Sequence, residues 1–152
     1  MSKNRVSTTM VAGLVCALVG GLAAATAEAR PFQVFKTSQN CSNRSLCNLP
    51  LASIPAGQNL EVRNVSCRYL IGTQSVETLE ASFDVLNQFG QVAFSESVVP
   101  VVLGRSGVGT FFSLSQPTTF FVPAGSSLRA RVATDAISSM LVSCSVAGNL
   151  TP

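Results

Sequence analysis

The sequence lacks histidine and tryptophan altogether, and it contains one tyrosine, Tyr69, in 152 residues. Without histidine, neither Ser-His-Asp nor Cys-His catalysis can operate, and histidine-ligated metal sites are excluded. Charged residues make up 11% of the chain, and the formal net charge is +3. Such a small excess of positive charge does not indicate nucleic acid or an anionic membrane surface as a partner. The composition therefore excludes histidine-dependent catalysis and histidine-ligated metals, and it argues against a nucleic-acid or membrane-surface partner.

The few acidic residues do not form a catalytic pattern either. Glu80 and Asp84 lie four residues apart on one predicted strand, which separates them by about 13 Å, too far for a retaining glycosidase pair. We expect Glu61, Glu80 and Asp84 to be solvated, because each falls on the polar phase of its strand. No Asp-rich loop indicates calcium, and the glycine-rich stretch Gly104–Gly109 lacks the lysine of a phosphate-binding loop. We predict a non-enzymatic protein with no catalytic residue, metal or cofactor.

The first 29 residues have the pattern of a bacterial signal peptide. Lys3 and Arg5 precede an apolar stretch from Met10 to Ala25, and Ala27-Glu28-Ala29 matches the small-x-small cleavage pattern. The alternative is an uncleaved N-terminal anchor, for which about 20 strongly apolar residues would be wanted. Removing residues 1–29 from the 152 leaves 123 residues, enough for one domain with its own core. We expect this domain, residues 30–152, to be periplasmic or secreted, without a membrane span.

Alternation of apolar and polar residues predicts an all-β domain. The clearest strand runs from Leu79 to Val85, and a first strand, Arg30 to Lys36, is expected at a sheet edge. Apolar positions change from even to odd numbers near Asn64, which predicts a β-bulge. Near the C-terminus we predict two strands, Leu128 to Val132 and Met140 to Val146, joined by a polar connection. About eight short strands with Pro/Gly turns indicate a single antiparallel β-sandwich or jelly-roll-like domain.

One stretch of the sequence occurs twice. Its two copies are Ile54-Pro55-Ala56-Gly57-Gln58-Asn59-Leu60 and Val122-Pro123-Ala124-Gly125-Ser126-Ser127-Leu128. Each predicts a turn, because proline fixes its own φ and glycine can adopt a positive φ, followed by an alternating strand. Val65-Ser66-Cys67 follows the first copy and Val142-Ser143-Cys144 follows the second. Together with the leader, these motifs resemble small exported bacterial β-sandwich proteins of uncharacterised role; the resemblance implies fold and export, and no functional residues.

Four cysteines follow the leader: Cys41, Cys47, Cys67 and Cys144. An even number in an exported chain favours disulfides, and zinc is disfavoured because there is no Cys-x-x-Cys spacing and no histidine. Four cysteines allow three pairings. We expect Cys67 to pair with Cys144 across the core, since both follow a repeat on the apolar phase of a strand. Cys41 and Cys47 would then close a local ring in a polar loop from Thr37 to Pro50.

These features favour a non-enzymatic binding or structural module of the bacterial cell envelope. Candidate binding contacts are Tyr69 with four arginines: Arg63, Arg68, Arg129 and Arg131. A carbohydrate-binding module is an alternative, weakened by the scarcity of tyrosine and tryptophan. A self-assembling, pilin-like surface subunit is a second alternative and would need an open sheet edge. We expect Phe35 to be covered by the Cys41–Cys47 loop, which would make the domain a monomer. The sequence does not identify a binding partner.

Overall fold

The computed structural model describes residues 28–37, 41–72 and 79–152, so the predicted signal peptide lies almost entirely outside the described residues. The described residues form eight strands and no helix, and all paired strands are antiparallel. This confirms the predicted all-β fold. The strands are β1 (Arg30–Thr37), β2 (Cys41–Ser53), β3 (Asn59–Ile71), β4 (Leu79–Leu86), β5 (Val92–Val98), β6 (Val101–Ser106), β7 (Gly109–Val122) and β8 (Ser127–Thr151).

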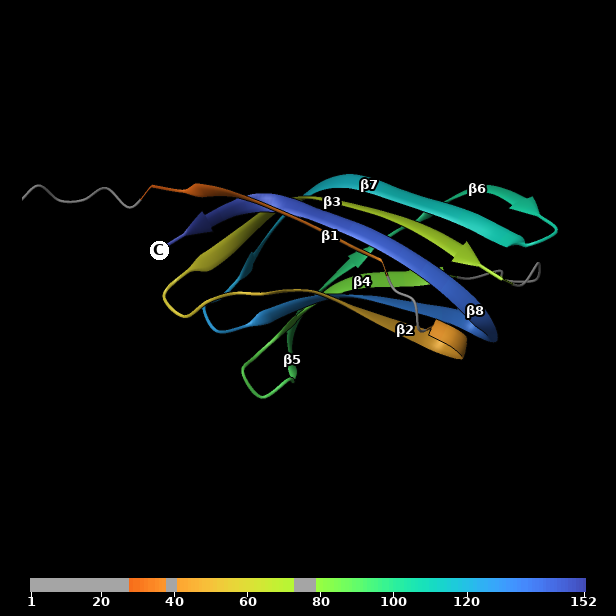
Figure 1. Cartoon of the computed structure of the whole chain (residues 1–152), viewed down its shortest axis with the longest axis horizontal. Coiled ribbons are helices and arrows are strands. Elements are labelled where there is room, and N and C mark those ends of the chain that lie inside the picture. The colour runs from red at the N-terminus through yellow and green to blue at the C-terminus, as the bar shows by residue number, and fades with distance from the viewer. Residues whose placement is uncertain (1–27, 38–40, 73–78) are drawn as a thin grey trace, which may run out of the picture.

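The 25-residue strand β8 organises the whole sheet. Its first part, residues 127–134, pairs with β4 on one side and β2 on the other, and residues 140–151 pair with β3 and β1. The strand curves between these parts and folds one continuous sheet into two layers (Figure 1). The first layer contains β5, β4, the start of β8 and β2, and the second contains β6, β7, β3, the end of β8 and β1.

The sequence predicted two short strands where the structure has β8. The polar connection expected between them, residues 134–139, is part of the continuous strand. Thr134 has its hydroxyl bonded to the Ala136 carbonyl oxygen at 2.8 Å, so a polar side chain supports the backbone at this position. Strand partners flank the segment, since Thr134 pairs with β4 and Ser138 with β2, and these contacts keep the polar backbone between them extended.

The core lies between the layers and follows the predicted alternation closely. In β3 the fully buried positions change from Leu60 and Val62 to Val65 and Cys67. The register shifts between Val62 and Asn64 against both neighbouring strands, which confirms the predicted bulge. Gly148 lies opposite Val62 at this bulge, where a Cβ would collide with the Glu61 carbonyl oxygen. The close approach of the two backbones therefore requires glycine.

The two repeated turns lie side by side. Gly57 and Gly125 have φ angles of 81° and 72°, as the positive φ predicted for each copy requires. The Ile54 N–H donates to the Ser126 carbonyl oxygen at 2.8 Å, and the Gly125 N–H donates to the Ile54 carbonyl oxygen at 3.1 Å. The turns thus bring the starts of β3 and β8 together at one end of the molecule.

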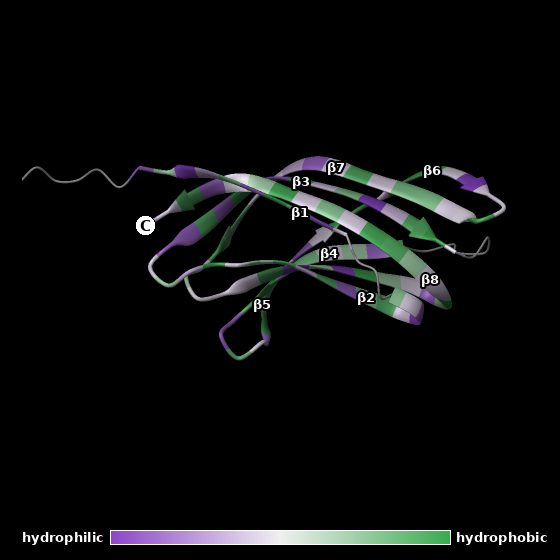
Figure 2. Cartoon of the chain, viewed as in Figure 1, coloured by the Kyte–Doolittle hydropathy of each residue, from purple (hydrophilic) through white to green (hydrophobic). Residues whose placement is uncertain are grey.

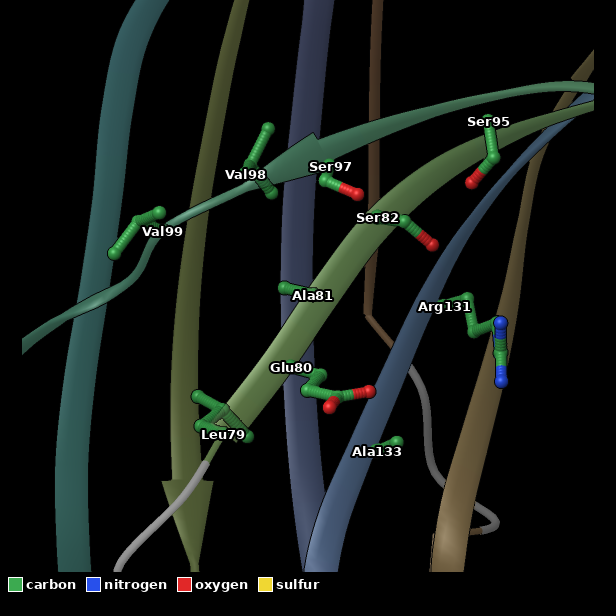
Figure 3. Close-up of a pocket in the computed structure, with 10 residues that line it drawn as sticks. All are labelled: Leu79, Glu80, Ala81, Ser82, Ser95, Ser97, Val98, Val99, Arg131 and Ala133. Carbon is green, nitrogen blue, oxygen red and sulfur yellow. The ribbon is translucent and has the colours of Figure 1, made fainter.

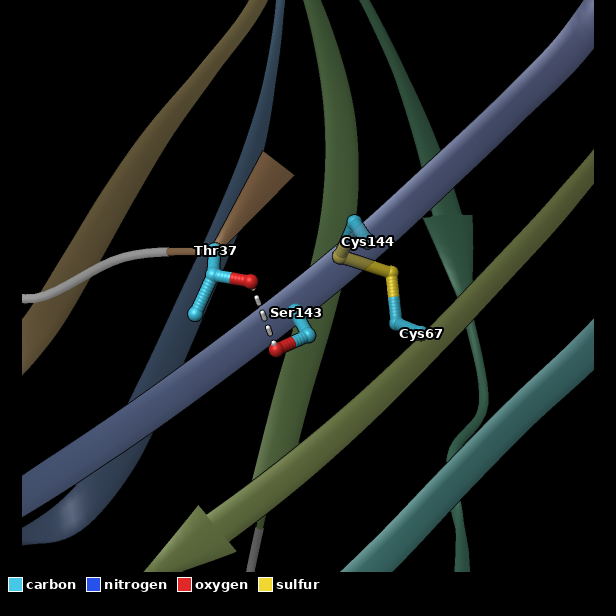
Figure 4. The surroundings of a disulfide bond; sticks show 4 residues. All are labelled: Thr37, Cys67, Ser143 and Cys144. Carbon is cyan, nitrogen blue, oxygen red and sulfur yellow. Dashed lines mark hydrogen bonds between the residues drawn. A yellow bond between two sulfur atoms is a disulfide. The ribbon is translucent and has the colours of Figure 1, made fainter. Parts of the chain in front are cut away.

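Both predicted disulfides are present. Cys67 and Cys144 are direct neighbours on β3 and β8, with Cα atoms 4.1 Å apart (Figure 4). Beside them, the hydroxyl groups of Ser143 and Thr37 of β1 share a hydrogen bond of 3.3 Å. The Cys67–Cys144 bond therefore joins adjacent strands of one layer, and the expectation that it crosses the core between layers was wrong. The two bonds indicate an oxidising, extracellular environment.

The Cys41–Cys47 ring does not lie in a loop. Both cysteines belong to β2, whose register against β8 shifts between Cys41 and Arg44 and again before Leu46. The segment looked like a loop because its polar side chains are exposed, whereas its backbone pairs with β8 and its two cysteines are buried. The disulfide closes the bulged part of an edge strand.

The edges of the sheet are β5, β2, β6 and β1. Pro100 falls between β5 and β6, two edge strands, as expected for a residue that cannot donate a backbone hydrogen bond. β1 pairs only with β8, which agrees with its predicted edge position. Phe35, however, is 66% exposed, so the expected cover from the disulfide-closed segment is absent. Phe35 lies opposite Ser145, on the outer face of the second layer.

Candidate functional site

The five predicted binding residues do not form one surface. Tyr69 is only 2% exposed, and burial raises the pKa of its hydroxyl, so its candidacy as an exposed contact was wrong. Arg63 is exposed and pairs with Glu61 at 2.9 Å. Arg68 is also exposed, on β3 of the second layer. The remaining two, Arg129 and Arg131, lie on the start of β8, in the first layer. The repeats suggested one cluster, but the layers separate their arginines.

Arg131 instead takes part in a hollow on the outer face of the first layer, which we call the polar basin. The basin has a volume of about 290 Å³ and is lined from β4, β5, β8 and the residue after β5 (Figure 3). Its lining residues are Leu79, Glu80, Ala81, Ser82, Ser95, Ser97, Val98, Val99, Arg131 and Ala133. Short serine and alanine side chains form much of this lining, which leaves room above the strands.

The register explains why these side chains meet. Ser82 of β4 lies opposite Arg131 of β8 and opposite Ser97 of β5, so all three side chains share the outer face. Glu80, two residues before Ser82, is a diagonal neighbour of Arg131, and Figure 3 shows Glu80 and Ser82 projecting from β4 toward β8. Among the described residues, neither Glu80 nor Arg131 has a hydrogen-bond or ion-pair partner. Both charges are therefore available to a ligand.

A buried ion pair holds one end of the basin. Asp84 is 1% exposed, and its Oδ2 accepts hydrogen bonds from Arg129 Nε at 3.0 Å and Arg129 Nη2 at 2.9 Å. Its Oδ1 accepts hydrogen bonds from the hydroxyl groups of Ser95 at 2.7 Å and Ser82 at 3.0 Å. The expectation that Asp84 is solvated was wrong. Its phase on β4 is indeed outward, but Arg129 and the two serines close around it.

The Asp84 carboxyl is ionised by these contacts. Burial by itself raises the pKa of Asp84, but hydrogen bonds from Ser95, Arg129 and Ser82, with the positive charge of Arg129, outweigh burial and hold the pKa below its ordinary value. Because Ser82 and Ser95 donate their protons to Asp84, their oxygens can act only as acceptors toward the basin. Arg131 supplies donors, Glu80 supplies an anionic acceptor, and the two serines present fixed acceptors.

The sequence contains a pattern consistent with the Asp84–Arg129 ion pair, but the pattern alone could not predict it. Opposite charges on the polar phases of two strands are typical of cross-strand partners, and Asp84 and Arg129 fit that description. The signal does not tell which strands are neighbours or in which register. Only the observed pairing of β4 with β8 places Asp84 opposite Arg129.

The basin contains no arrangement typical of catalysis. Its one carboxylate, Glu80, has no second carboxyl among the lining residues, and its serines have no general base beside them other than the Asp84 carboxylate, whose hydrogen bonds are already made. No group of three or more Asp, Glu, Cys or His side chains is placed to hold a metal ion in the part of the chain that the structure describes. No helix long and apolar enough to cross a membrane occurs among those residues.

Comparison with known proteins gives a distant likeness of fold. No family model and no curated protein matches the sequence. The infectious bursal disease virus VP2 subviral particle shares 16% identity at a TM-score of 0.43, with 79% of this chain and 32% of that chain covered. Latent PorU from Porphyromonas gingivalis shares 13% identity at a TM-score of 0.40, with 82% and 13% covered. The chain thus spans about a third or less of these proteins, and the likeness carries no functional argument.

Proposed function

We propose that this protein is an exported, non-enzymatic binding module of the bacterial cell envelope, and that the polar basin is its ligand site. The observation that carries the proposal is that Glu80 and Arg131, two charged residues without ion-pair partners among the described residues, lie beside Ser82 and Ser95 in one hollow. The hydroxyl groups of these serines are oriented by their hydrogen bonds to Asp84. The paired strands fix the backbone positions of these charged residues, so binding has to order only their side chains. The rest of the domain, with its paired strands and two disulfides, supplies the rigid support.

The donor and acceptor pattern limits the ligand class. A guanidinium matches a carboxylate or phosphate in planar geometry, whereas Glu80, Ser82 and Ser95 can accept hydrogen bonds from hydroxyl or ammonium groups. A small ligand that carries one acidic group and several hydroxyl or amino groups fits this pattern. Acidic or amino-substituted sugars of envelope polymers have such chemistry. No aromatic side chain lines the basin, so a sugar would be held by hydrogen bonds and charge alone.

The first test measures binding to an array of envelope glycans and glycopeptides. The protein should bind acidic or amino-substituted members, and Arg131→Ala and Glu80→Gln should each weaken binding about tenfold, the effect of losing roughly 1.4 kcal/mol. Arg63→Ala is the matched control, because Arg63 is an exposed arginine that is paired with Glu61 in the other layer. Binding that is equally weakened by Arg63→Ala, or unaffected by both basin variants, would contradict the proposed site.

Export is tested separately at the N-terminus. Cleavage after Ala29 should give a mature protein that begins at Arg30, because Ala27 and Ala29 provide the small residues that signal peptidase requires. Intact mass spectrometry of the protein from the periplasmic and culture fractions would measure this end and decide between periplasmic and secreted locations. A mature protein that retains Met1 would support the N-terminal anchor instead.

One observation favours a second candidate function, a self-assembling surface subunit. Phe35 projects from the edge strand β1 with two thirds of its surface exposed. Exposed aromatic rings of this kind are typical of contact surfaces when other apolar groups lie on the same face. The candidate differs from ligand binding in both its residues and its layer, so the two can be tested independently.

A further inference from the structure

The outer face of the second layer carries a projecting aromatic ring. Phe32 and Val34 of β1 pack partly against the core, whereas Phe35 has the opposite phase and is 66% exposed. A strand with apolar groups on both faces is either covered by its own domain or used on a partner. The described residues leave Phe35 uncovered, so a partner that packs on this face would remove its ring from water.

The same face carries an apolar hollow. The hollow has a volume of about 360 Å³ and is formed where the end of β3 lies between β7 and β8, in a region of apolar residues (Figure 2). Its lining residues are Arg68, Tyr69, Leu70, Leu103, Phe111, Phe112, Leu141 and Ser143. Three of them are large apolar side chains with substantial exposure: Leu103 at 68%, Leu141 at 47% and Phe111 at 38%. The volume is ample for one phenyl ring.

Short serine side chains, which we call the serine floor, lie between the Phe35 ring and the apolar hollow. Phe35 lies opposite Ser145, four residues along β8 from Leu141, which places it about 13 Å along the strand from Leu141 in the hollow. Between them, Ser66, Ser143 and Ser145 line a smaller depression of about 230 Å³ beside Phe35. Arg68 and Ser143 border both depressions. No long side chain other than Arg68 stands between the projection and the hollow in these linings.

We propose that a second copy of this chain packs against the outer face of the second layer, with Phe35 of each copy inserted into the apolar hollow of the other. A two-fold interface is self-complementary, so it requires that one surface carry both a projection and its receptor. This face carries both. A two-fold axis midway between Phe35 and the hollow places Phe35 of each copy at the hollow of the other. The serine side chains lie at that axis, where their small size allows the second layers of the two copies to approach each other.

The size of the apolar surface suits this occupant. For side chains of about 150–250 Å², the exposed fractions of Phe35, Leu103, Phe111 and Leu141 amount to about 400 Å². A stable dimer buries about 800 Å² on each partner, of which somewhat more than half is apolar. The four side chains supply most of that apolar half, and the serine floor supplies polar area at the centre.

The charge on this face sets the salt dependence that distinguishes a second copy from an acidic partner. Arg68 is the one charged residue that lines the hollow, and it has no partner among the described residues. In the dimer the two Arg68 side chains lie near the axis and repel each other, so added salt should strengthen association by screening them. An acidic partner would show the opposite dependence, because salt would screen an attraction to Arg68.

The test is the oligomeric state of the mature, disulfide-bonded protein by sedimentation equilibrium at low and high salt. A dimer should form, with a dissociation constant that falls as salt rises. Phe35→Ser should raise that constant at least tenfold. Phe89→Ser is the matched control: Phe89 is 76% exposed, but it lies in the β4–β5 hairpin away from this face, and its replacement should leave the dimer unchanged.

Covalent trapping tests the proposed contact itself. Equimolar Phe35→Cys and Leu141→Cys variants, mixed under mild oxidation, should form a disulfide-linked heterodimer. The control mixture of Phe89→Cys and Leu141→Cys should not. A monomer at all concentrations up to the millimolar range would overturn the proposal, as would a dimer that weakens with salt or is unaffected by Phe35→Ser. Any of these results would leave the polar basin untouched, because it lies in the other layer.

Discussion

Replacing both Cys67 and Cys144 with alanine should lower the free energy of unfolding by about 4.5 kcal/mol, close to the whole stability of a marginal domain. The bond links residues 77 apart in sequence, so its loss frees a long loop in the unfolded chain. Both residues are also almost fully buried between the layers. Urea unfolding followed by circular dichroism should show the loss as a lower transition midpoint.

The second disulfide provides the matched comparison. Cys41 and Cys47 are only six residues apart, and the same model assigns their ring about 2 kcal/mol. The double alanine variant of this pair should therefore remain folded under conditions in which the other double variant unfolds. If the short ring proved equally important, its main effect would be to hold the bulged edge of β2 and not to restrict the unfolded chain.

Replacing Arg129 with methionine should destabilise the domain by about 3 kcal/mol at neutral pH. The Asp84 carboxylate would remain buried with only Ser82 and Ser95 as donors, and burial, which already raises its pKa, would then dominate. Asp84→Asn in the same background should recover part of the loss, since an amide carries no charge. Thermal or urea unfolding of the three proteins measures these differences.

The pH dependence of stability distinguishes this mechanism from a simple packing defect. In the wild type, the folded pKa of Asp84 is lowered, so its contribution is present above the unfolded value of about 3.9 and is lost as pH falls through the folded pKa. In Arg129→Met the folded pKa should be raised, so protonation stabilises that variant at acidic pH. The difference between the two proteins should therefore shrink as pH falls. A difference that is constant between pH 7 and pH 3 would show that lost packing dominates.

Local features of the chain were predictable because they depend on neighbouring residues alone. The alternation in β3, the bulge near Asn64 and the positive φ of Gly57 and Gly125 follow from side-chain periodicity and from the conformational range of glycine and proline. The disulfide pairing was predictable because Cys67 and Cys144 share the apolar phase and have a common context. None of these inferences needed to know which strands are neighbours.

The candidate site depended on knowing which strands are neighbours. The pairing of β4 with β8 decides that Asp84 is buried against Arg129 and that Ser82 and Arg131 share a hollow. Periodicity had placed Asp84 correctly on the outer phase but could not show that neighbouring side chains would enclose it. The five residues proposed for binding were grouped by sequence similarity between the repeats, whereas strand pairing assigns them to two layers and to the core.

The sequence by itself determined which faces of the strands are apolar, where the two repeated turns lie and that the four cysteines after the leader pair as disulfides. Only the tertiary structure decided that β8 continues through a polar segment, that Cys41–Ser53 is a strand and that Phe35 remains uncovered. Side-chain alternation reports burial on one strand at a time. Backbone hydrogen bonds between strands are made regardless of side-chain polarity, so partners distant in sequence can hold polar segments extended and can leave an apolar ring facing outward.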